Sequence, residues 1–441
     1  MSNRVLIVSP HFPPINAPDH QRVRMSLAYF EKFGWEPHVL AVEADYVEGI
    51  QDPLLIKTIP CSVPVTYTKA LPVQQTKRIG MGSLGLRSFP YLLRAGNDLL
   101  RKKDFDLVYF STTIFTSMAL GLLWYRRFNI PYVLDFQDPW LSDYYRKTGV
   151  TPPGGHFKYE LAQLEAKFLE PKVLSKVSHV ISVSPAYPET LQQRYPNLRS
   201  DQFSILPFGA SESDFELLPS LQVKQTIFDP KDGKRHWVYV GRGGDDMANS
   251  LRILFLGIQT ERQRNPELWQ SVHMHFVGTS YAQGNRAVKT VEPIAQKLGV
   301  GDLVTEHPHR IPYFEALQVL SDSDAILMIG SDDPSYTASK LYPCVLARKP
   351  ILAIFHQLSS VVNILHSCQA GQAVTFASSD QPQKLLPEII TQLNWLISIP
   401  KGFQPQTNWS AFEPYTAKAM TSQQCAIFNQ CFVTSNKSKS L

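Results

Sequence analysis

The sequence predicts an α/β protein built from doubly wound parallel sheets. Short apolar runs, such as Ala325–Gly330 (AILMIG) and Ile351–Phe355 (ILAIF), have the length and composition of strands buried on both faces. Segments with apolar residues at helical spacing lie between such runs, and this alternation continues along nearly the whole chain. In sheets of this class, ligands bind outside the carboxyl ends of the strands, where helix amino termini present unpaired N–H groups.

The first elements of the chain follow this alternation. Arg4–Ser9 is predicted as a strand, and the proline-rich loop Pro10–His20 leads into a helical segment that Gly34 stops. Asp19 stands where the loop meets the helix. It is a candidate catalytic carboxylate, but it could equally be the cap of the helix, which is a common role for aspartate.

The next stretch, Lys57–Lys103, is irregular and basic, with aromatic and leucine residues between its cations. One interpretation is a surface for anionic lipid head groups or a lipid-linked acceptor. The alternative is a solvated helix face with a mobile loop. The stretch contains a single acidic residue, Asp98, and the basic residues Lys57, Lys69, Lys77, Arg78, Arg87, Arg94, Arg101, Lys102 and Lys103.

A further strand-like run, Ile130–Phe136, ends in Gln137-Asp138-Pro139-Trp140. Loops at strand ends commonly carry functional residues. A carboxylate at this edge could contact an acceptor hydroxyl, so Asp138 is a candidate catalytic residue. Asp138 could also be an ordinary turn residue before proline.

The second half of the chain offers a candidate phosphate site. His236–Val240 is predicted as a strand, and Gly241-Arg242-Gly243-Gly244 follows it directly before a helix. Such a glycine loop can cradle phosphate, although it does not match the G-x-G-x-x-G dinucleotide fingerprint. The next predicted strand, Val272–Val277, ends at Gly278.

Another loop of this kind follows Ala325–Gly330. It contains Asp332 and Asp333, and Lys340 stands close to the start of the next helix. A lysine at the positive end of a helix dipole is unfavourable by roughly 0.3–1 kcal/mol, and a bound anion would reverse the sign. The alternative is a surface lysine that snorkels. Pro343 predicts that this helix begins near Ser339 or is kinked, because proline disrupts a helix interior.

These segments resemble the GT-B glycosyltransferases, most closely the large family 4. The similarity rests on the Gly241-Arg242 pair, on Ser339–Ala347 (SKLYPCVLA) with the Lys349-Pro350 turn, and on the loop at Asp138, which is similar to a D-[FL]-R-D-P-W motif with Gln137 in place of arginine. The family usually carries two glutamates that hold the donor sugar and ribose. Here, Ser335 and Pro343 stand in their places.

The resemblance implies two Rossmann-like domains facing across a cleft. The first, residues 1–207, would take the acceptor, and the second, residues 220–404, the nucleotide-sugar donor. A linker over 208–219 would join them, and a helix over 405–435 would cross back to the first domain. The implied donor-binding residues are Arg242, Lys340, Gly241, Gly243, Gly278, Asp332 and Asp333. The implied reaction is a hexosyl transfer that retains the anomeric configuration and needs neither metal ion nor cofactor.

Composition sets further bounds. The chain has 441 residues, a net charge of +5 and 44% hydrophobic residues, which is typical of a soluble protein and gives no argument for nucleic-acid binding. Five scattered cysteines without a C-x-x-C pair favour a reducing compartment, so we expect a cytoplasmic protein, peripheral at most to the membrane. The longest apolar run, Ile114–Tyr125, is too short to span a bilayer, and the opening RVLIVSPHFPP is too short for an export signal. Asp322-Ser323-Asp324 spells a D-x-D metal motif, but we expect it away from the site edge.

Two other functions remain open at this stage. The missing glutamates favour a paralogue without transferase activity that acts as a binding or scaffold subunit. A GT-B epimerase would need clusters of histidine and glutamate in the cleft, and the sequence shows no compelling one. If the chain is a transferase, the side chains of Arg242 and Lys340 should point into the same space. Because like charges repel, without ligand the two cations should keep apart or pair with Asp332 or Asp333, and a bound diphosphate should draw them together.

Overall fold

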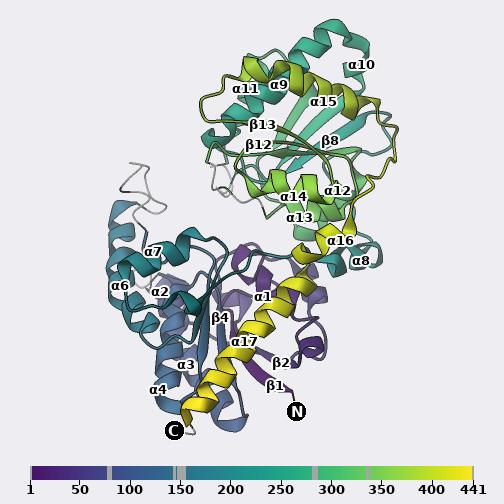
Figure 1. Ribbon diagram of the computed structural model, residues 1–441. Helices are drawn as coiled ribbons and strands as arrows, with labels where there is room; N and C mark the ends of the chain where they lie inside the picture. Colours follow the sequence, from purple (N-terminus) through teal and green to yellow (C-terminus); the bar gives the residue numbers. More distant parts are fainter. Residues whose placement is uncertain are drawn as a thin grey trace. The chain divides into compact units, whose positions relative to one another are not determined.

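The computed structural model describes residues 2–76, 82–142, 146, 155–280, 287–333, 336 and 339–439 (Figure 1). The chain forms two compact units. The first consists of Met1–Gly209 together with Ala417–Leu441, and the second of Ala210–Thr416. Helix α8 (Glu212–Leu221) occupies most of the segment expected as a linker and belongs to the second unit.

Within the described residues, the first unit contains a seven-stranded parallel sheet with the order β3-β2-β1-β4-β5-β6-β7. Its strands are β1 (Asn3–Val8), β2 (Trp35–Val42), β3 (Val65–Thr68), β4 (Leu107–Ser111), β5 (Tyr132–Phe136), β6 (His179–Ser182) and β7 (Phe203–Ile205). The order reverses direction at β1 and β4, which is the switch point where ligands bind in doubly wound sheets.

Both faces of this sheet are covered, which explains the continuous apolar strands. Leu6 and Val8 of β1 pack into one cluster, whereas Val5 and Ile7 pack into a second cluster on the other face. The helices are α1 (Gln21–Ser26), α2 (Val73–Thr76), α3 (Leu84–Lys102), α4 (Ala119–Phe128), α6 (His156–Leu174), α7 (Ala186–Arg194) and α17 (Ala417–Lys439).

Helix α17 brings the end of the chain back to its beginning. Its Phe428 is fully buried and lies against Phe30, Trp35 and Tyr109, with ring centroids 6.2, 5.3 and 5.1 Å away. Ser26 also donates a hydrogen bond to Gln424. The helix therefore completes the face of the first sheet that α1 covers (Figure 1).

The described part of the second unit has a six-stranded parallel sheet with the order β10-β9-β8-β11-β12-β13. Its strands are β8 (Arg235–Val240), β9 (Val272–Val277), β10 (Val304–His307), β11 (Ala325–Ile329), β12 (Ile351–His356) and β13 (Gln372–Phe376). Its helices are α8, α9 (Ala248–Arg264), α10 (Pro266–Gln270), α11 (Glu292–Lys297), α12 (Tyr313–Asp322), α13 (Leu341–Leu346), α14 (Ser360–Cys368), α15 (Leu386–Ser398) and α16 (Trp409–Phe412).

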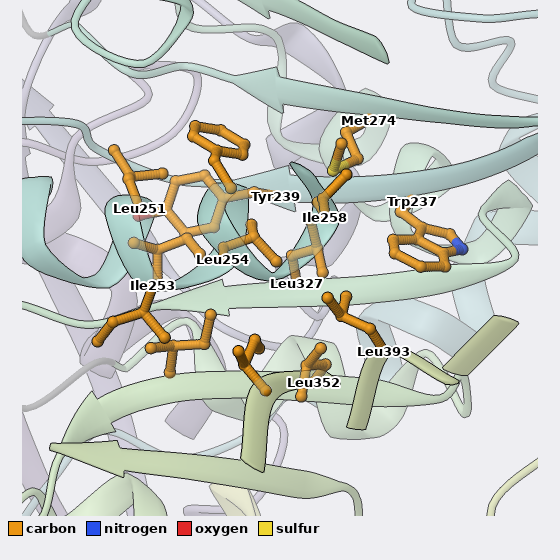
Figure 2. Packing of buried hydrophobic residues seen from close by; sticks show 14 of the residues in the cluster. Trp237, Tyr239, Leu251, Ile253, Leu254, Ile258, Met274, Leu327, Leu352 and Leu393 are labelled. Atoms are coloured by element: carbon orange, nitrogen blue, oxygen red, sulfur yellow. The ribbon is translucent and has the colours of Figure 1, made fainter. Parts of the chain in front are cut away.

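The core of this unit lies between the sheet and helices α9 and α15. Figure 2 shows Leu251 and Leu254 of α9 beside Leu327 of β11, with Leu393 of α15 close to the same cluster. Each of these side chains is at most 1% exposed, so burial of this apolar surface is the main stabilising contribution to the unit. The core fixes α9, and the loop before α9 is the candidate phosphate site.

Several local predictions can now be judged. The prediction for Pro343 is confirmed, because α13 begins at Leu341 and Pro343 lies in its first turn. The long helix expected from Gln21 to Gly34 is wrong in length: α1 ends at Ser26 and a separate 3-10 turn precedes Gly34, which has a φ of +81°. Asp324 accepts a hydrogen bond from the backbone of His236 at the amino ends of β8 and β11, away from the strand-end loops as predicted.

The basic stretch Lys57–Lys103 is only partly a surface. Arg87 is 1% exposed, and its guanidinium donates to the carbonyl oxygens of Leu71 and Tyr46. It therefore holds α3 to the neighbouring loops and cannot reach a lipid head group. Lys77 and Arg78 lie outside the described residues. No helix in the described ranges combines the length and the apolarity needed to cross a membrane.

Candidate functional site

The loop after β8 is joined to the end of β9 through backbone hydrogen bonds. Gly241 donates to the carbonyl oxygen of Val277 at 2.9 Å, and Gly243 donates to that of Thr279 at 2.7 Å. A Cβ atom on Gly241 would collide with the ammonium group of Lys340, and one on Gly243 would collide with Thr290. Glycine at these two positions therefore permits the close approach of backbone and side chains.

Arg242, between these glycines, forms a bidentate ion pair with Asp246. The guanidinium nitrogens lie 2.9 and 2.6 Å from the carboxylate oxygens, and the guanidinium carbon lies 4.8 Å from the ring centroid of Tyr336. Ser331 also donates to Asp246, at 2.6 Å. The hydrogen bonds to Asp246 raise the pKa of Arg242 above its ordinary value. Burial would raise the pKa of Asp246, but hydrogen bonds from Arg242 and Ser331 hold it below its usual value.

Lys340 lies at the amino end of α13 and turns toward the same loop. Its ammonium group donates to the hydroxyl of Tyr239 and lies 4.3 Å from the centroid of that ring. The Tyr239 hydroxyl in turn donates to the carbonyl oxygen of Arg242 at 2.6 Å. Burial, and then the positive charge of Arg242, lower the pKa of Lys340 to about 7. The alternative of a snorkelling surface lysine is therefore wrong.

Arg242 and Lys340 thus both lie at the loop after β8: the Tyr239 hydroxyl joins the Lys340 ammonium group to the backbone carbonyl of Arg242, while the Arg242 guanidinium turns to Asp246. The ion-pair partner of Arg242 is Asp246, which the expectation of Asp332 or Asp333 had not named. The sequence analysis did not single out Asp246, although a spacing of four residues, as between Arg242 and Asp246, is a usual one for an ion pair.

The other predicted donor-binding residues surround this cluster. The backbone N–H of Asp332 donates to the carbonyl oxygen of Asp246, and that of Asp333 donates to the Ser331 hydroxyl. Both aspartate residues are exposed. Partial desolvation of the Asp332 carboxyl, and then the charge of Asp246, raise the pKa of Asp332. Gly278 follows β9 with a φ of +75°. Ser335, in the place of a family glutamate, lies outside the described residues.

A second residue that the sequence analysis missed is Glu306. Its buried carboxylate accepts hydrogen bonds from the hydroxyl of Thr279 at 2.5 Å and from the backbone N–H groups of Thr290, Val291 and Glu292. It holds the chain after β9 against the amino end of α11. Because Thr279 contacts Gly243, Glu306 positions the glycine loop from behind.

In the first unit, Asp19 is not a helix cap. Ala17 precedes the 3-10 turn Pro18–His20 that contains it, and the buried Asp19 carboxylate accepts from the backbone and hydroxyl groups of Thr113 and the hydroxyl of Thr112. The ring Nδ1 of His11 lies 3.0 Å from both carboxylate oxygens. Burial would raise the pKa of Asp19, but these contacts lower it to about 2. The carboxylate therefore stays ionised and orients His11, a residue that the sequence analysis had not singled out.

Asp138 has the opposite character. It is exposed and follows β5 at the sheet edge, between buried Gln137 and exposed Pro139. Partial desolvation of its carboxyl by the surrounding atoms, and then the charge of Asp19, raise its pKa. Gln137 lies within hydrogen-bond distance of the Asp19 carbonyl oxygen and of buried Asp135, which also pairs with Arg22 at 2.8 Å. These contacts fix the loop that presents Asp138.

Among the described residues, no three histidine, cysteine, aspartate or glutamate side chains are grouped so that they could hold a metal ion. The second unit instead offers two cations, Arg242 and Lys340, beside the glycine loop at one sheet edge. Such an arrangement can bind a phosphate group, because charged hydrogen bonds favour anions.

Comparison with known proteins bears on the fold. Residues 20–209 match the family model of the glycosyl transferase 4-like domain. No curated protein matches the chain significantly. Among solved structures, HepE of Anabaena in complex with UDP-glucose is similar, with 16% identity, a TM-score of 0.52 and 99% of each chain covered.

Two further structures share the fold. A UDP-forming trehalose-phosphate synthase from Burkholderia xenovorans has 12% identity and a TM-score of 0.56, over 97% of this chain and 99% of that one. A putative UDP-N-acetylglucosamine 2-epimerase from Listeria monocytogenes has 11% identity and a TM-score of 0.51, over 98% and 97%. The predicted GT-B fold and the resemblance to family 4-like glycosyltransferases are confirmed.

Proposed function

We propose that this chain, which has the GT-B fold and carries a glycosyl transferase 4-like domain, moves a hexosyl group from a nucleoside-diphosphate sugar to a hydroxyl of a glycan or lipid-linked acceptor. The observation that carries the proposal is the cluster of Arg242, Tyr239 and Lys340 beside the glycine loop. The titles of the similar HepE structures name UDP-glucose and UDP as bound ligands, which supports a nucleotide sugar as donor.

The second unit would stabilise the leaving diphosphate. As the bond between sugar and phosphate breaks, negative charge grows on the phosphate oxygens, and preorganised donors stabilise such charge without reorganising. Arg242 and Lys340 would supply the positive charge. Because two protein cations can neutralise the diphosphate, we propose a reaction that needs no metal ion or cofactor and retains the anomeric configuration.

The first unit would take the acceptor. Asp138 has a raised pKa at a strand end, which suits a carboxylate that contacts the acceptor hydroxyl and takes up its proton. Asp19 has a pKa of about 2 and is already surrounded by donors. It therefore fits a positioning role, in which it holds the His11 ring in one orientation.

We further propose that the protein works in the cytoplasm, in glycan synthesis at or near the membrane surface. All five cysteines are free, and four of them are buried, which suits a reducing compartment. Burial raises the pKa of Cys344, Cys425 and Cys431 to about 12, so these thiols would be unreactive.

The first experiment is a thermal-shift screen of the full chain against nucleosides, nucleoside diphosphates and their sugars. A ligand present at a hundredfold excess over its Kd stabilises the folded protein by about 2.7 kcal/mol. We expect stabilisation by a diphosphate but little by its nucleoside. A chain stabilised by none of them would contradict the proposed function.

The second experiment is a transfer assay with the stabilising donor. Asp138→Asn should reduce transfer strongly while donor binding is unchanged, since Asp138 is assigned to the acceptor. Donor binding without transfer by the wild type, over a broad set of acceptors, would favour the alternative of a binding or scaffold subunit. That alternative has the two missing family glutamates in its favour, since Ser335 and Pro343 stand in their places.

A further inference from the structure

Helix α6 presents apolar side chains to solvent from Phe157 to Phe168. Phe157, Leu161, Leu164 and Phe168 are 85, 51, 62 and 62% exposed. Their spacing of four, three and four residues places them on one helix face, which we call the apolar stripe. The opposite face is already buried in the first unit through residues such as Ala166. The stripe is therefore surplus to the core, and an exposed row of this kind marks an interaction surface.

Exposed lysines flank the stripe on both sides. At about 100° per residue, Lys158 and Lys172 lie on one flank and Lys167 on the other. The ammonium group of Lys172 lies 3.0 Å from the ring centroid of Phe168, so its carbon stem runs beside the stripe.

The carboxylates of the same helix are already engaged. Glu160 pairs with Arg146, Glu165 accepts a hydrogen bond from Thr116, and Glu170 is buried and pairs with Arg194. The flanks of the stripe are therefore positively charged on balance. An apolar stripe between two basic flanks is the pattern of a helix that lies in the interface of an anionic bilayer.

We propose that α6 is the surface through which this protein binds anionic membranes, with the apolar stripe inserted at the boundary between head groups and acyl chains and the three flanking lysines at the lipid phosphates. The inference deepens the proposed membrane association and rests on it, but it assigns that association to α6. The stretch Lys57–Lys103, by contrast, has its Arg87 buried in the protein.

A second copy of the chain is a poorer occupant of the stripe. Two α6 helices packed along their stripes would bring the lysine flanks of both copies close together, and like charges repel. An anionic bilayer reverses this effect, because each basic residue near such a surface is attracted to it, with a gain of about fivefold in binding.

The test is cosedimentation of the full chain with phosphatidylglycerol vesicles and with phosphatidylcholine vesicles. The wild type should bind the anionic vesicles, and binding should weaken as salt rises. The double variant Phe157→Gln/Phe168→Gln should bind at least tenfold more weakly. Lys158→Glu/Lys167→Glu should also lose binding, which separates the charge from the apolar contribution.

The matched control is Leu358→Gln. Leu358 is 70% exposed, but it lies in the second unit, and this variant should bind vesicles as the wild type does. Equal binding by the wild type and both α6 variants would overturn the assignment. So would a wild-type dimer in sedimentation equilibrium that the α6 variants dissociate, with no vesicle binding. Nucleoside-diphosphate binding, measured in parallel, should be unchanged in all variants, so failure of the proposed sugar transfer would be seen separately.

Discussion

At the scale of single residues, the unusual feature is a buried lysine beside a glycine loop that also carries an arginine. The positive charge of Arg242 is compensated by the carboxylate of Asp246. Lys340, among the contacts described, donates only to the neutral hydroxyl of Tyr239. Burial and the neighbouring guanidinium both disfavour a proton on Lys340, which is why its pKa falls to about 7. A diphosphate bound here would supply the missing negative charge.

Changing Arg242 to Ala should weaken nucleoside-diphosphate binding by about 1.5–3 kcal/mol, the contribution of a charged hydrogen bond, while nucleoside binding should change little. Isothermal titration calorimetry with both ligands measures the difference. Arg262→Ala is the matched control, because Arg262 also forms a bidentate pair, with Asp302, but stands fourteen residues after the start of α9, about 21 Å along the helix. An equal loss for nucleoside and diphosphate would contradict the assigned role.

The pKa of Lys340 predicts a pH-dependent affinity. Below about pH 7 the lysine is already charged, whereas above it the anion must bind together with a proton. The Kd for a nucleoside-diphosphate sugar, whose phosphodiester groups do not titrate here, should therefore rise toward tenfold per pH unit between about pH 7 and about pH 9. Lys340→Met should bind more weakly at about pH 7 and show a flat profile. A flat wild-type profile would refute the prediction.

The sequence predicted part of this arrangement. The glycine loop identified Arg242, and the helix dipole identified Lys340, since both signals are local in the chain. Tyr239 and Glu306 carried no such signal, because their roles depend on side chains that only the fold brings near, such as Lys340 and Thr279. Asp19 was found as a residue, but its partners at Thr113 come from 94 positions further along the chain.

At the scale of elements, four histidines form a row across the second sheet. His236 of β8 lies beside His275 of β9, at 3.0 Å between ring nitrogens, and the rings of His273 and His307 lie 4.9 and 6.0 Å from that of His275. The ring of Phe228 stacks on His236 at 4.3 Å. Burial first, and then the neighbouring imidazoles, lower the pKa of His275 to about 3.

This row predicts acid sensitivity. His275 stays neutral in the folded protein, whereas in the unfolded chain it takes up a proton below about pH 6.5, so stability is lost as the pH falls from that value toward 3. His275 alone should contribute up to about 1.4 kcal/mol per pH unit. Urea unfolding at about pH 7.5 and about pH 5 should show a smaller loss for His275→Phe, which keeps the ring packing, than for the wild type. Equal losses would show that other groups, such as buried His20 or His38, dominate.

The elements themselves were largely predictable, because buried strands are short apolar runs and proline and glycine mark helix ends. Pro343 fixed the start of α13 correctly for this reason. The error at α1 has a physical cause as well. Leu27 and Phe30 lie at helical spacing and are buried, but the helix ends at Ser26 and they lie in the turn between it and the 3-10 turn Glu31–Phe33. The spacing of apolar residues indicates which side chains are buried, but here tertiary packing determined the backbone conformation.

At the scale of the whole molecule, the chain crosses between its units twice, at Gly209 and at Thr416. Helix α17 is far from the first unit in sequence but belongs to its core, where Ala417, Met420 and Phe428 share a cluster with strands β1, β2 and β4. The hydrophobic core of the first unit therefore cannot form fully until α17 has packed onto the sheet. A sequence pattern alone could predict a helix there, but only the family resemblance suggested its destination.

This connection predicts that Phe428→Ala destabilises the first unit and leaves the second unit unchanged. Removing a fully buried phenylalanine costs about 3–5 kcal/mol, because its transfer free energy is lost and a cavity remains among Phe30, Trp35 and Tyr109. Hydrogen exchange, followed by mass spectrometry in increasing urea, measures each unit separately through the peptides of its own sheet. Peptides of β1 and β4 should exchange at lower urea in the variant, while those of β8 and β11 should not.

Phe403→Ala is the control, since Phe403 is 40% exposed in the second unit and should alter stability by less than about 0.5 kcal/mol. Equal destabilisation of both sheets by Phe428→Ala would mean that the two units unfold as one, and an effect no larger than that of Phe403→Ala would show that α17 does not stabilise the first core.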